Sequence, residues 1–171
     1  MPEVNVSTSE LMPASFHVPP SLVKAPPPAL NVPVHQSATA QQRNILGRQF
    51  VKAGRYAEAI EEFQKAASLS PRDRQILRDL AYGHAISGKR AEALTMLKAI
   101  QDNYEKHEAL GLDIAAVYAG LGENDQAFVW LEKDFQRHGA VLPSVAYWSW
   151  FDSLRGDSRY ADLLRRMALK P

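Results

Sequence analysis

Residues of matching type recur every 34 positions across residues 41–136. Five sets keep this step: Gly54, Gly88 and Gly122; Ala59, Ala93 and Ala127; Leu46, Leu80 and Ile114; Gly47, Ala81 and Ala115; and Phe63, Leu97 and Leu131. Five matched sets in one register are hard to produce by chance, and this period is typical of a helix–turn–helix unit. A single helix pair cannot bury both of its faces, so the sequence predicts a stack of similar helical hairpins.

The first unit indicates why each repeat forms two helices. Apolar residues keep a 3.6-residue period on both sides of Gly54, which supplies the left-handed backbone that ends a helix at low cost. We expect Gly47 to face Ala59, so that the two helices approach closely, and Phe63 to fill the wedge before the next unit. The same pattern, with Asp73 as an N-cap, predicts helices over residues 42–53, 55–70, 74–87, 90–103, 108–121 and 124–136.

Residues 44–71 read NILGRQFVKAGRYAEAIEEFQKAASLSP. They combine a set of spaced residues: Leu46, Gly47, Phe50, Gly54, Tyr56, Ala59, Phe63, Ala66 and Pro71. This combination resembles a tetratricopeptide repeat. The resemblance implies an all-α fold, a right-handed superhelix (α-solenoid) of three hairpins at about residues 40–73, 74–107 and 108–139. Later repeats depart from the family pattern at His84, Glu105 and Asp134, where an aromatic residue, a closing Pro and an Ala are usual.

The last thirty residues break the repeat register, as a terminal cap would. We assign the cap to residues 140–171, with Asp157 capping a final helix over residues 158–168. An aromatic cluster precedes this helix, and we expect it to cover the exposed side of the helix predicted over residues 124–136. Its members are Tyr147, Trp148, Trp150 and Phe151. Residues 109–169 are similar to the end of many bacterial tetratricopeptide proteins, in which such repeats follow a kinase, a winged-helix regulator or a cyclase domain.

Residues 1–38 form a different kind of chain, because they hold eight of the 11 prolines and show no sustained apolar period. We expect a disordered Pro-rich tail with local polyproline II around residues 25–28. Three roles stay open: a linker, a docking segment for a partner, or a segment that lies in the groove of its own repeats. No P-x-x-P spacing occurs, which argues against an SH3 ligand.

Composition argues against several classes of function. A net charge of +1 over 171 residues argues against a nucleic-acid partner, and zero Cys removes disulfides, thiol catalysis and Cys-based zinc sites. No apolar run approaches the roughly 20 residues that cross a bilayer, and the first residues do not resemble a secretion signal. The His residues lack metal-ligand spacing, and phosphate-loop and kinase motifs are missing. We therefore expect a cytoplasmic protein that is no enzyme, with no cofactor, no metal and no membrane span.

The first helices of stacked hairpins line a concave groove, where a peptide can bind. We predict these groove residues: Asn44, Arg48, Val51, Lys52, Gln75, Arg78, Tyr82, Ile86, Leu112 and Ala116. This surface changes from cationic and polar to apolar along the stack, which fits an extended peptide with an acidic part or a short amphipathic helix. Chaperone-tail binders of this family hold a C-terminal carboxylate with Lys, Asn and Arg side chains of the first helices. Some of the equivalent positions here carry Asp79, Ala109 and Asp113, which would oppose a carboxylate, so we exclude that subtype.

These observations predict a non-catalytic protein–protein interaction module, an adaptor or scaffold with a protein or peptide partner. The alternative is a regulatory C-terminal appendage of a bacterial signalling kinase or transcription regulator. A third possibility is self-association, because the outer side of the first helix lacks a neighbouring repeat.

Overall fold

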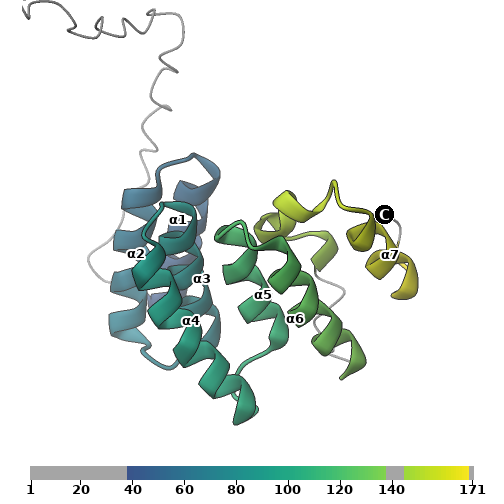
Figure 1. Cartoon of the computed structure of the whole chain (residues 1–171). Helices are drawn as coiled ribbons and strands as arrows, with labels where there is room; N and C mark the ends of the chain where they lie inside the picture. The colour runs from purple at the N-terminus through teal and green to yellow at the C-terminus, as the bar shows by residue number, and fades with distance from the viewer. Residues whose placement is uncertain (1–37, 138–144, 170–171) are drawn as a thin grey trace, which may run out of the picture.

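The computed structural model describes residues 38–137 and 145–169, and within them every regular element is a helix (Figure 1). Three hairpins follow one another: α1 (Ala40–Lys52) with α2 (Tyr56–Leu69), α3 (Arg74–Ile86) with α4 (Arg90–Glu105), and α5 (Gly111–Gly120) with α6 (Asn124–Gln136). A 3₁₀ helix, η3 (Ser149–Leu154), and α7 (Ser158–Arg166) end the described chain. The predicted all-α repeat fold is confirmed, whereas the expectation of a disordered tail falls almost wholly outside the described residues.

The turn glycines end the first helix of each hairpin as predicted. Gly54, Gly88 and Gly122 have φ angles of 72°, 81° and 74°, in the left-handed region where a side chain would be strained. Asp73 and Asp157 accept hydrogen bonds from backbone amides in the first turns of α3 and α7, as expected of N-caps. These local signals place the hairpins in one register along the chain.

Phe63 of α2 fills the wedge between the first two hairpins, as predicted. A Cβ on Gly47 would lie 2.6 Å from Cδ1 of Phe63, and a Cβ on Gly83 would lie 3.3 Å from Cδ2. The three atoms nearest to a Cβ on Gly47 all belong to Phe63, so the ring of Phe63 packs against Gly47, whereas the expected contact of Gly47 with Ala59 stays a prediction. Small residues on both α1 and α3 therefore make room for one aromatic side chain that is 1% exposed.

The departure from the family pattern at Asp134 has a structural reason. Its carboxylate on α6 accepts hydrogen bonds of 2.9 Å from the backbone amides of Gly111 and Leu112, the first residues of α5. Burial raises the pKa of Asp134, while these two hydrogen bonds act in the opposite direction. Helix α5 therefore begins at Gly111, three residues later than predicted, where its free amides meet the carboxylate.

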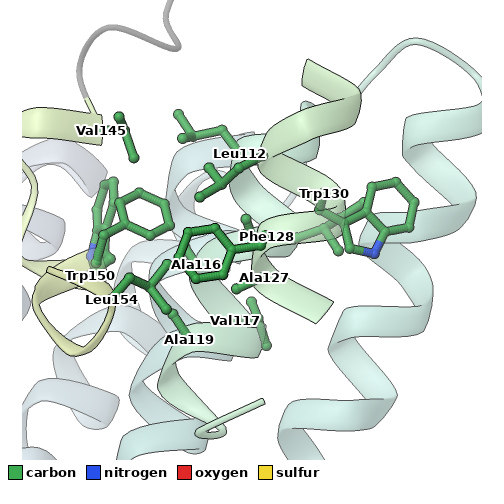
Figure 2. Packing of buried hydrophobic residues seen from close by; sticks show 14 of the residues in the cluster. Leu112, Ala116, Val117, Ala119, Ala127, Phe128, Trp130, Val145, Trp150 and Leu154 are labelled. Atoms are coloured by element: carbon green, nitrogen blue, oxygen red, sulfur yellow. The ribbon is translucent and has the colours of Figure 1, made fainter. Parts of the chain in front are cut away.

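The first helices pack side by side, α1 against α3 and α3 against α5, and each second helix also contacts the next hairpin. The main core extends from α3 to the end of α7, and Figure 2 shows part of it around α5. In this core Trp150 and Leu154 lie beside Ala116 and Ala119 of α5, and Val145 belongs to the same cluster. Among the described residues, no helix is both long enough and apolar enough to cross a membrane.

Candidate functional site

The C-terminal residues 145–154, which we term the C-terminal wall, lie on the concave side of the hairpin stack. The Trp150 ring stacks on the guanidinium of Arg78 in α3, with 3.8 Å between Arg78 Cζ and the ring centroid. Trp148 meets Trp150 edge to face, with 4.4 Å between their centroids. The wall also contacts α5 through η3.

The prediction that the aromatic cluster covers α6 is therefore wrong. Helix α7 takes that place, because it packs against α6 and its Arg159 stacks on Phe128 at 4.3 Å. The aromatic side chains of the wall instead cover a buried cation and the apolar residues of α5. Aromatic rings suit this position because their faces attract a guanidinium that has lost water contact.

Asp79 on α3 collects three donors from two neighbouring first helices. Its carboxylate accepts from Asn44 Nδ2 at 2.9 Å, Arg48 Nε at 2.6 Å and Arg78 Nε at 3.1 Å. Asn44, Arg78 and Asp79 are each 1% exposed, so this is a buried polar cluster. Buried ion pairs add little net stability over apolar residues of similar size, but removing one partner leaves the other charge buried and unpaired, which is strongly destabilising.

The same arrangement recurs one repeat later. Asp113 on α5 stands 34 residues after Asp79 and accepts from Arg74 Nη1 at 2.7 Å and Arg78 Nη1 at 3.1 Å. Arg78 therefore bridges the two carboxylates, while its Nη2 has no hydrogen-bond partner among the described residues. The carboxylates neutralise most of the cationic charge that the sequence suggested for this face.

Four predicted groove residues are buried and lie beneath the wall or inside the ionic cluster: Asn44, Arg78, Leu112 and Ala116. Their side chains are engaged with this chain itself. Gln75 is exposed but does not line the described cavities of this face. The structure brings the remaining five together at the edge of the wall: Arg48, Val51, Lys52, Tyr82 and Ile86.

Two adjoining cavities remain between α1, α3 and the wall. The first has a volume of about 310 Å³, and the second, about 560 Å³, extends to Ile86 and Asp152. Both are lined by Val51, Lys52 and Tyr82 on the helix side. Burial raises the pKa of Tyr82 to about 12, with smaller contributions from Asp152 and other acidic groups, so its phenol stays neutral at ordinary pH.

Among the residues of the first cavity that the sequence did not predict are one aliphatic and two aromatic side chains at its mouth. Ile45, Tyr147 and Trp148 line it, and Ile45 and Tyr147 are 54% and 79% exposed. The aromatic pair was visible in the sequence, but its position over α3 depends on contacts between distant parts of the chain. In the described residues no group of three or more His, Asp and Glu side chains could hold a metal ion. The side chains of the two cavities are apolar, aromatic, polar or cationic, with Asp152 as the one acid, which suits binding.

A family model described as Tetratricopeptide repeat matches residues 43–166, more than half of the chain. Comparisons with curated proteins and with solved structures gave no match. The family match agrees with the 34-residue register, the left-handed turn glycines and the stacked hairpins. Tetratricopeptide repeats generally mediate protein–protein interactions and are typically non-catalytic. The chain belongs to the tetratricopeptide repeat family.

Proposed function

We propose that this protein is a non-catalytic adaptor that holds a segment of a partner protein in the groove formed by the two adjoining cavities. The observation that supports the proposal is the open space left between α1, α3 and the C-terminal wall. The wall covers part of the concave surface, yet the part between α1, α3 and the wall keeps apolar and cationic side chains together.

The side chains around the groove suggest the chemistry of the partner segment. Lys52 is exposed and makes no ion pair with any residue that the structure describes. Val51, Ile86 and the ring of Tyr82 lie beside it in the second cavity. Asp152, the one acid there, is paired with Arg155 at 2.7 Å. An acidic residue next to one or two apolar residues would match this surface.

The size of the cavities favours an extended segment. The two volumes lie within the range of about 300–1,000 Å³ that is common for small-molecule pockets, so each cavity has room for only a few side chains of a partner. A helix has a diameter of about 10–12 Å and needs a longer open trough. Because the wall covers Leu112 and Ala116 of α5, the open part of the groove is short, and an extended segment can insert its side chains there where a helix has too little room.

The proposal is tested with two charge reversals of equal size. Lys52→Glu places a negative charge in the groove, whereas Lys98→Glu makes the same change on an exposed residue of α4 outside both cavities. Proteins retained from native lysate by the full chain and by each variant are identified by mass spectrometry. We expect Lys52→Glu to lose specific partners that Lys98→Glu and the unaltered chain retain, by about tenfold for one desolvated charge contact.

Equal retention by Lys52→Glu and the unaltered chain would contradict the proposal and direct the search to the convex face. Arg78→Glu is unsuitable for this purpose, because Arg78 is 1% exposed and bonded to two carboxylates. A Glu there would put three acids together in the interior and unfold the protein. Circular dichroism of both Lys variants verifies that their helix content is unchanged.

A further inference from the structure

The mouth of the first cavity carries apolar and aromatic side chains that the described chain leaves uncovered. Ile45 is 54% exposed and Tyr147 is 79% exposed, and both line the cavity together with Tyr82, Trp148 and Trp150. Every lining residue is apolar, aromatic, polar or cationic, and none is an acid. Aromatic grooves of this kind bind Pro-rich segments, whose restricted backbone loses little entropy when it docks.

We propose that the Pro-rich residues 25–30 of the same chain occupy this cavity. Their sequence is APPPAL, with three consecutive prolines, one Leu and no charged residue. Proline rings and an aliphatic side chain fit against Tyr147, Trp148 and Tyr82. The segment needs no ionic partner, and the ion pair of Arg48 with Asp79 stays intact when it docks.

The position of α1 allows the segment to reach the cavity. The lining residues of α1 run from Ile45 to Lys52, which places them about 8–18 Å along the helix from its start at Ala40. Ten residue steps lead from Leu30 to Ala40, and an extended chain of that length spans about 31 Å. The segment therefore runs back along α1 in the opposite direction to the helix.

Because only a short stretch of chain connects residues 25–30 to α1, weak contacts are sufficient to keep them in the cavity. A ligand tethered by a short flexible linker has an effective concentration on the order of millimolar, so a millimolar affinity already fills half of the sites. A partner segment must then compete with the chain's own residues 25–30. This regulatory consequence rests on the proposed function, whereas occupancy by residues 25–30 does not depend on it.

The experiment measures the tail in the full chain without any partner. The chain has no Cys, so Ser21→Cys gives a single site for a nitroxide label four residues before the segment. The protein has three Trp residues, whose indole N–H signals are assigned by single Trp→Phe variants. We expect the label to remove more than half of the signal of Trp148 and Trp150. Trp130 packs against Tyr104 outside the cavity and should keep its signal.

Three outcomes would overturn the proposal. Equal signal loss, or none, at all three Trp residues would place residues 25–30 elsewhere. The same loss after Pro26, Pro27 and Pro28 are replaced with Gly would mean that the label is merely near the cavity. Signal loss in an unlabelled, isotope-enriched copy mixed with a nitroxide-labelled copy would assign the cavity to a second molecule. Because no partner is present, these outcomes leave the Lys52→Glu capture result unaffected.

Discussion

Replacing Trp150 with Ala removes the side chain that joins the C-terminal wall to α3. Trp150 is 7% exposed and lies on Arg78, which is 1% exposed. Truncating a buried Trp to Ala costs about 3–5 kcal/mol, because apolar area is lost and the cavity does not fully collapse. The cation–π contact of a guanidinium without water is worth about 2 kcal/mol, so we expect a loss at the upper end of this range.

Urea unfolding followed by far-ultraviolet circular dichroism measures the change in the free energy of unfolding. Trp130→Ala is the matched control, since Trp130 is 8% exposed and meets Tyr104 at 5.0 Å away from the groove. We expect a loss of about 3–5 kcal/mol for this control as well. Tyr147→Ala changes a side chain of the same wall that is 79% exposed, and should cost less than about 0.5 kcal/mol.

A loss below about 1 kcal/mol for Trp150→Ala, with the full loss for Trp130→Ala, would refute this reasoning. The wall would then be a loosely attached segment, and the surface beneath it would be open to a partner. In that case Leu112 and Ala116 would return to the binding surface as the sequence predicted. A large loss means that residues 145–154 form a permanent side of the groove.

Two further substitutions test the packing and the pH dependence. Gly47→Ala puts a methyl group against Phe63 and should cost about 1–3 kcal/mol in urea unfolding, whereas Gly156→Ala, with open space around it, should be neutral. Burial, and to a smaller extent the charge of Lys89, lowers the pKa of His84. The stability that the neutral, buried imidazole contributes is therefore fully present above about pH 6.5, and it is lost as the pH falls through the folded-state pKa. His84→Phe should remove this loss, so its advantage over the unaltered chain should grow between about pH 7.5 and about pH 5; an advantage that stays constant would contradict the assignment.

Local chemistry made the hairpins predictable from the sequence. Gly54 and Asp73 act on their own turn or helix end, so their roles do not depend on distant contacts. The wedge position of Phe63 followed from the repeat register in the same way. The close contact of Phe63 with Gly47 did not follow from it, because the register alone does not say which side chain comes nearest to a glycine.

The candidate site was predictable only in part, because its shape depends on a segment that returns over α3 from far along the chain. Aromatic content indicated that residues 147–151 would be buried against something, but hydrophobicity alone does not select a face. The ionic cluster left a readable signal, since Asp79 and Asp113 stand one repeat apart beside Arg48 and Arg78. That pattern indicates buried charges on the concave face. Burying them requires another segment of the chain to lie over them and exclude water.

The most direct test of the account is the environment of the Trp150 ring in solution, because the position of the wall determines which part of the groove stays open. Nuclear Overhauser contacts of the indole protons, measured on the full chain, report on neighbouring protons. The account predicts contacts from Trp150 to the side chain of Arg78 on α3. Contacts from Trp150 to α6 alone, or to no other helix, would contradict it.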